Sequence, residues 1–186
     1  MLDTTHSDRT QAFLDRFGAA LAEGDIAAAR DMFTDDCYWR DLVTFTWNIK
    51  TVEGKDQVED MLKHQLAATK PSGWTLAAGE IPTEEGGVTT AWIEFETEVA
   101  RGYGLIRLKD DKIWTLLTTM VELKGHEEPA GDNRALGAKH GAGKNRETWA
   151  EERAREEAEL GYETQPYCLI IGGGQGGIAM GARLRQ

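Results

Sequence analysis

The apolar pattern of the chain changes at Pro71 from a helical period to a strand period, and this change most constrains the fold. Before Pro71, apolar residues recur at helical spacing in three segments: residues 10–23, 26–33 and 54–69. After it, apolar and polar residues alternate in four segments: residues 74–81, 88–99, 103–109 and 112–124. Asp110–Asp111 predicts a tight hairpin, and successive hairpins give an antiparallel sheet. The pattern therefore predicts a compact α+β domain.

One further strand is expected between the second and third helices. The segment CYWRDLVTFTW, residues 37–47, is rich in aromatic and β-branched side chains. The resulting order is helix, helix, strand, helix and four antiparallel strands. This order resembles the cone-shaped fold shared by ketosteroid isomerase and scytalone dehydratase, over residues 8–124. The resemblance implies three helices on a curved antiparallel sheet.

Composition restricts the partners and the compartment. The chain has 186 residues and a formal net charge of -11, which disfavours the phosphate contacts of nucleic acids and anionic membranes. No apolar stretch approaches the ~20 residues of a membrane span, and the polar start MLDTTHSDRT has no signal core. Cys37 and Cys168 lack ligand-like spacing, which is typical of reduced thiols. We therefore expect a soluble, cytoplasmic protein without a nucleic-acid or membrane partner.

The segment after the predicted sheet has no apolar periodicity. It begins with GHEEPAGDNRALGAKHGAGKN, which is typical of a linker, and continues with a charged helix over residues 145–160. Thr148 and Glu151 form a capping box, and Gly161 stands where the helix should end. The predicted organisation is a cone-shaped domain, a charged linker with a helix, and a C-terminal unit: residues 1–124, 125–165 and 166–186.

A glycine cluster follows the apolar run YCLII near the C-terminus. Gly172, Gly174 and Gly177 match the spacing of the dinucleotide fingerprint. The first glycine allows a tight turn, the second lets backbone approach a pyrophosphate, and the third lets the next helix pack closely. The acidic residue expected ~20 positions later lies beyond Gln186, and the neighbouring parallel strands are missing. This pattern predicts the first βα unit of a truncated Rossmann-type FAD-binding domain.

A cone domain, a charged linker helix and a dinucleotide fold together resemble flavin-containing monooxygenase-like proteins. That resemblance implies the N-terminal part of an FAD- and NAD(P)H-dependent oxidoreductase, with the truncated chain inactive alone. Its NADP motif would lie outside this chain. The resemblance assigns the FAD pyrophosphate to one loop: Gly172, Gly173, Gly174, Gln175, Gly176 and Gly177.

The cone domain also carries candidates for acid–base chemistry of its own. They are Tyr38, Arg40, Asp41 and His64, although a strand would point Arg40 and Asp41 to opposite faces. The four histidines lie in unrelated segments, so no metal site is predicted. An alternative hypothesis is therefore a stand-alone cone domain that binds a small apolar molecule or acts as a dehydratase or isomerase, with a vestigial tail.

The last predicted strand is apolar on both faces. Alternation places Trp114, Leu116 and Met120 on its outer face. In a one-layer sheet that face is normally polar and exposed to solvent. An apolar outer face implies that another protein surface packs against it. The sequence predicts a homodimer through the outer sheet face, or docking to the missing flavoprotein domain, alongside a small-molecule substrate.

Overall fold

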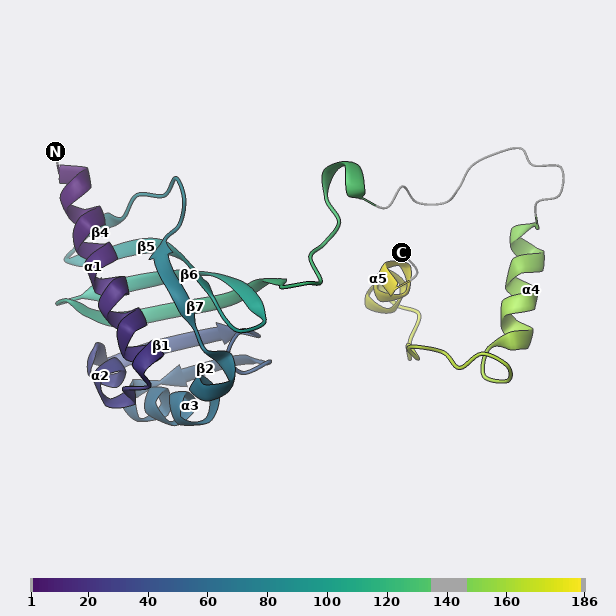
Figure 1. Cartoon of the computed structure of the whole chain (residues 1–186), viewed down its shortest axis with the longest axis horizontal. Coiled ribbons are helices and arrows are strands. Elements are labelled where there is room, and N and C mark those ends of the chain that lie inside the picture. Colours follow the sequence, from purple (N-terminus) through teal and green to yellow (C-terminus); the bar gives the residue numbers. More distant parts are fainter. Residues whose placement is uncertain (1, 135–146, 185–186) are drawn as a thin grey trace. The chain divides into compact units, whose positions relative to one another are not determined.

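A computed structural model describes residues 2–134 and 147–184, with side chains from residue 6 onward (Figure 1). The chain divides into two units, Met1–Glu128 and Pro129–Gln186. Every residue that the structure describes as buried lies in the first unit. The core of the described chain is therefore that of the first unit alone.

Three helices of the first unit follow from local sequence signals. They are α1 (Leu2–Glu23), α2 (Ile26–Asp31) and α3 (Gly54–Thr69). The sequence prediction for α3 is confirmed over its full length, whereas α1 begins eight residues earlier than the periodicity indicates. Gly24 has a φ of +71° and ends α1, and the Asp25 carboxylate caps α2 by accepting a hydrogen bond of 2.9 Å from Ala28 N.

The strands form one seven-stranded sheet in the order β2-β1-β7-β6-β5-β3, with β4 paired to β5. Their bounds are β1 (Phe33–Leu42), β2 (Ile49–Glu53), β3 (Ser72–Leu76), β4 (Thr83–Glu85), β5 (Val88–Glu96), β6 (Ala100–Lys109) and β7 (Lys112–Leu123). The prediction of a wholly antiparallel sheet is wrong at one place, because β1 is parallel to β7. The chain passes from edge strand β2 through α3 to the opposite edge strand β3, so the two halves of the sheet meet at β1 and β7.

Aromatic side chains fill the space between the helices and the sheet. Phe17 of α1 packs edge-on against Phe33 and Trp74, with ring centroids 5.9 and 5.1 Å apart. Trp74 stacks on Phe95 at 4.5 Å. Aromatic pairs in these geometries add to the stabilisation from burial alone. The interior of the cone is thus a packed aromatic core, completed by Trp39 and Phe45.

The face assignment of β7 is corrected by a β-bulge. Arg107 pairs with Thr115 but Leu108 pairs with Ile113, so Trp114 is an extra residue in the ladder. The alternation shifts by one residue there. Leu116 is consequently 2% exposed and belongs to the core, and it does not lie on the outer face.

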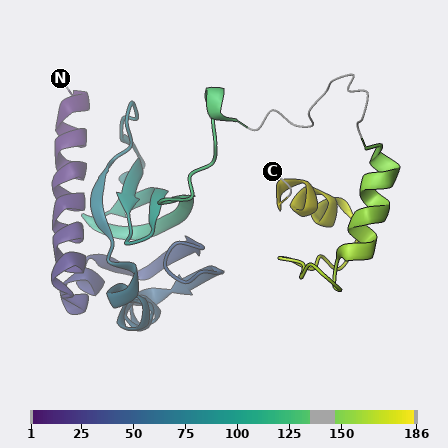
Figure 2. The same ribbon diagram turned by 45° about the vertical axis from the view of Figure 1, so that its right-hand side comes forward.

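The outer face of the sheet carries rows of side chains in register across the strands. One row contains Trp92, Leu105 and Leu117, and the next row contains Tyr103, Thr119 and Leu42. Each of these side chains is half-buried or exposed. The helices contribute their core residues to the opposite face, and Figure 2 shows α1 running along one side of the sheet. We call these six residues the outer sheet face.

The described residues of the second unit form two helices, α4 (Trp149–Glu159) and α5 (Gln175–Leu184), and a 3-10 turn, Gly131–Asn133. The predicted capping box of α4 is confirmed, with both Thr148–Glu151 bonds present. Part of the predicted linker, residues 135–146 with His140, lies outside the described residues. The expected strand YCLII is absent from the described chain: residues 167–171 are unpaired, and Tyr167 and Ile171 are 97% and 92% exposed.

Candidate functional site

Asp41 is fully buried at the end of β1 and serves as an acceptor for the following loop. Its carboxylate accepts hydrogen bonds from Phe45 N at 3.0 Å, from Thr46 N at 2.8 Å and from Thr46 Oγ1 at 2.8 Å. On the other side, Thr118 Oγ1 donates to it at 2.8 Å and itself accepts from Trp39 Nε1 at 2.9 Å. A buried carboxylate with this many donors has a structural role, which is to hold the β1–β2 loop and its Phe45 in the core.

The other predicted acid–base candidates do not converge on Asp41. Tyr38 and Arg40 lie on the outside of β1, as the alternation predicts, and Arg40 Nη1 donates to Thr51 Oγ1 at 2.9 Å. His64 is exposed on α3, where its Nδ1 lies 2.8 Å from the carbonyl oxygen of Asp60. The four side chains therefore form no common acid–base site.

A groove lies between the C-terminal part of α1, α3 and the start of β3. Its volume is about 520 Å³. The floor is apolar, made by Leu21, Ile26, Leu62 and Leu66, while charged groups stand only at the rim. We call it the α1–α3 groove. The sequence did not reveal it, because its lining comes from residues 21–26 and 62–72, which are far apart in the chain.

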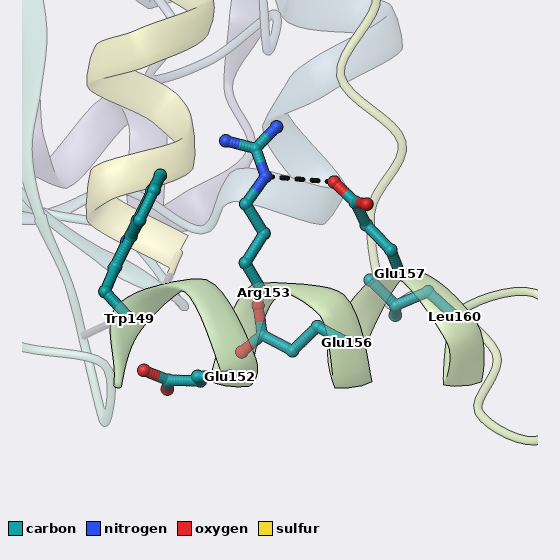
Figure 3. A pocket seen from close by; sticks show the side chains of 6 residues that line it. All are labelled: Trp149, Glu152, Arg153, Glu156, Glu157 and Leu160. Carbon is teal, nitrogen blue, oxygen red and sulfur yellow. Dashed lines mark hydrogen bonds and ion pairs between the residues drawn. The ribbon is translucent and has the colours of Figure 1, made fainter. Parts of the chain in front are cut away.

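The surface of α4 offers a smaller hollow of about 270 Å³ (Figure 3). Trp149 and Arg153 project from the same side of the helix, with the guanidinium carbon 5.4 Å from the ring centroid. Arg153 Nε also donates to Glu157 Oε1 at 2.9 Å. All the lining residues come from this helix and its C-cap residue Leu160, and Trp149 is 69% exposed. The hollow is an exposed helix face, and the arginine is already engaged by its neighbours.

The glycine loop has part of the local geometry that the fingerprint requires. Gly172 has a φ of +112°, which favours glycine, and a Cβ on Gly177 would collide with the carbonyl of Gly172. The helix expected after the loop forms as α5. A Cβ at Gly173, Gly174 or Gly176 would meet open space. The assignment of these glycines and Gln175 to an FAD pyrophosphate stays a prediction.

The residues present do not fit a complete FAD site. The apolar run before the loop has no strand partner in the described chain, and the helix after it has no buried residue. We expect the 186-residue chain, incubated with excess FAD and desalted, to retain no flavin, because a few backbone N–H groups cannot replace the adenine, ribose and flavin contacts. Absorbance at 450 nm after desalting is the measurement; stoichiometric yellow protein would contradict this expectation.

The described residues contain neither a cluster of metal ligands nor a helix suited to crossing a membrane. No group of three His, Cys, Asp or Glu side chains within residues 6–134 and 147–184 is placed to hold a metal ion. None of the helices in the described ranges has the length and apolar character needed to cross a membrane.

The fold and the groove define a mixed α+β, NTF2-like cone domain with a curved sheet. The SnoaL-like domain model matches residues 14–116, more than half of the chain. The chain belongs to the SnoaL-like domain family. No curated protein matches its sequence.

Solved structures of similar fold have low sequence identity. A protein assigned as an aromatic ring hydroxylase from Novosphingobium aromaticivorans is 14% identical, with a TM-score of 0.50, over 64% of this chain and 92% of that chain. A domain of unknown function with a cystatin-like fold from Nostoc punctiforme is 12% identical, with a TM-score of 0.51, over 63% and 78%. An NTF2-like protein of unknown function from Cytophaga hutchinsonii is 18% identical, with a TM-score of 0.40, over 59% and 87%.

These comparisons correct the functional prediction made from the glycine motif. The family match falls on the cone domain, and neither an FAD-binding nor a monooxygenase family is found. The interpretation of the chain as part of a flavin-dependent, NADP-using monooxygenase with a Rossmann domain is therefore wrong. The glycine spacing alone is a weak signal, because the fingerprint also needs a paired strand before it, and residues 167–171 form none. The alternative hypothesis, a cone domain of small-molecule-binding type, agrees with the family.

Proposed function

We propose that this protein binds a small molecule with an apolar body in the α1–α3 groove, without transforming it. The observation that carries the proposal is the groove itself, with an apolar floor and a volume of about 520 Å³. Ligand sites in proteins are typically concave, mostly apolar and roughly 300–1,000 Å³ in volume, with a few polar groups. The groove has these properties.

The geometry favours binding over a dehydratase or isomerase reaction. Such reactions need an acid or base within hydrogen-bond reach of the bound substrate. The only carboxylate among the predicted candidates, Asp41, is fully buried and engaged by backbone and hydroxyl donors. The described groove lining contains no histidine or tyrosine and one carboxylate, that of Glu23 at the rim. The other ionisable groups of that lining, Lys63 and Lys70, are exposed and paired with Glu59 and Glu98.

The groove can be tested by filling it. Ala67 lines the groove on α3 and is exposed, so Ala67→Trp should occupy the space without disturbing the core. Ala68→Trp is the matched control, because Ala68 is exposed on the same helix outside the lining. We expect 1-octanol to shift backbone amide resonances around Leu62 and Leu66 in the wild-type chain and in the control, but not in Ala67→Trp.

Two results would overturn the binding proposal. One is a wild-type chain whose amide resonances do not move, up to the solubility limit of 1-octanol. The other is an Ala67→Trp variant that responds as the control does.

We also propose that the outer sheet face is the contact between two copies of the chain. Its central row, Trp92, Leu105 and Leu117, is apolar, and Trp92 stacks on Tyr103 with centroids 5.3 Å apart. Contiguous exposed apolar surface of this kind marks association sites, and a symmetric pair is the commonest closed arrangement. Because the core-forming helices occupy the other face, a second copy can cover this one without displacing any element of the first unit.

A further inference from the structure

The rim of the α1–α3 groove carries two lysines on its α3 side, and they indicate the chemistry of the ligand. Resting on the proposed function, we infer that the ligand is an amphipathic monocarboxylate whose apolar chain lies on the groove floor and whose carboxylate lies between Lys63 and Lys70. The inference uses the position of the two ammonium groups, their present partners and the charge of the opposite rim.

Lys63 of α3 and Lys70, the residue that caps the C-terminus of α3, both line the groove. Leu66 and Ala67 lie between them and line the groove. Lys70 has a left-handed backbone, with φ of 43° and ψ of 59°, and it closes the helix by donating its N–H to Leu66 O. A carboxylate above this stretch therefore has Lys63 on one side and Lys70 on the other.

Both lysine side chains are exposed, and they pair with the half-buried Glu59 and the exposed Glu98. Lys63 Nζ lies 2.6 Å from Glu59, and Lys70 Nζ lies 3.0 Å from Glu98. Exposed ion pairs contribute little free energy, so the lysines can turn to a ligand at small cost. Glu59 is additionally paired with Arg30 Nε at 2.9 Å, so it keeps a cationic partner when Lys63 leaves.

The remaining groups at the groove direct an anion to the α3 side. Glu23 stands on the α1 side of the rim and repels a carboxylate there. Near the end of α3, Leu66 O accepts from Lys70 N at 3.0 Å and Gln65 O accepts from Thr69 Oγ1 at 2.9 Å. The chain as a whole has a net charge of -11, so an anion needs local cations in order to bind. The two lysines are those cations.

The test compares one ligand body with two head groups. Octanoate and 1-octanol are titrated separately into the full chain, and dissociation constants are taken from amide chemical shifts. We expect octanoate to bind about tenfold more tightly than 1-octanol at low salt, as two partly exposed charge contacts can provide. In the double variant Lys63→Gln/Lys70→Gln that preference should fall to about twofold or less, with 1-octanol affinity unchanged. The control Lys50→Gln/Lys112→Gln has the same net charge as Lys63→Gln/Lys70→Gln, but it alters two exposed lysines outside the groove.

The outcomes separate this inference from the proposed function. Equal affinities for octanoate and 1-octanol in the wild-type chain, with both ligands shifting groove resonances, would overturn the carboxylate inference and leave groove binding intact. Loss of the octanoate preference in the control variant as well would also overturn it, because net charge and not the two lysines would then be responsible. If neither ligand reaches the groove, both the proposed function and this inference are wrong.

Discussion

Leu117→Glu will give a folded monomer, whereas the same substitution at the adjacent Leu116 will unfold the first unit. The two leucines are neighbours in β7 and have the same side chain, so they differ only in the face they occupy. Leu116 is 2% exposed within the aromatic core, and Leu117 lies in the central row of the outer sheet face. The pair is therefore a matched test of the face assignment and of the dimer.

The expected effects differ by several kcal/mol. An unpaired carboxylate at Leu116 must enter the core or force it open, which costs more than about 4 kcal/mol, a large part of the 5–15 kcal/mol typical of a domain. At Leu117 the glutamate reaches solvent in the monomer, and its effect on the monomer's free energy of unfolding should stay within about 1 kcal/mol. In the dimer the same carboxylate would be buried opposite an apolar surface.

Urea unfolding followed by circular dichroism measures the free energy of unfolding of each variant. Sedimentation velocity at tens of micromolar shows whether each is a monomer or a dimer. Thr115→Glu is a further comparison. Thr115 lies on the same outer side of β7 as Leu117, but it pairs with Arg107 of β6. A wild-type chain that sediments as a monomer would contradict the dimer proposal. A Leu117→Glu chain that unfolds, or a folded Leu116→Glu chain, would contradict the face assignment.

The same strand shows where sequence patterns stop being sufficient. Local signals predicted α3 over its full length, the Asp25 cap and the Asp110–Asp111 hairpin, because each depends on residues within a few positions. The face of β7 depends on the bulge at Trp114, which exists only in pairing with β6. Both faces of β7 are apolar, so hydrophobicity alone could not show the change of register.

The candidate site was less accessible from the sequence than the fold. The groove joins the turn after α1 to the end of α3, and no local motif marks a contact between segments so distant in the chain. The glycine loop had the opposite property. Its spacing is a strong local signal, and Gly172 and Gly177 do adopt the tight geometry it implies, but the strand it needs depends on partners that the described chain does not provide.

Removing the carboxylate of Asp41 will be the most destabilising single change of a polar side chain in the cone domain. We expect Asp41→Ala to lower the free energy of unfolding by about 3–5 kcal/mol, because the N–H groups of Phe45 and Thr46 and the hydroxyl of Thr118 would be left buried without an acceptor. Asp41→Asn keeps one oxygen acceptor and should lose roughly half as much. The control is Asp36→Ala on the exposed side of β1, with a change within about 0.5 kcal/mol.

The reason for so large an effect is that Asp41 fixes a loop that is unfavourable by itself. Val43 and Trp47 have φ values of 60° and 51°, a conformation that non-glycine residues adopt only when their surroundings enforce it. The bonds from Phe45 and Thr46 to the carboxylate enforce it, and they seat the Phe45 ring 5.0 Å from that of Trp39. Urea unfolding gives the free energies, and the near-ultraviolet circular dichroism of Trp39 should weaken in Asp41→Ala under native conditions. If Asp41→Ala proves as stable as Asp36→Ala, or keeps the native aromatic spectrum, the loop is held by the packing of Phe45 and not by the carboxylate.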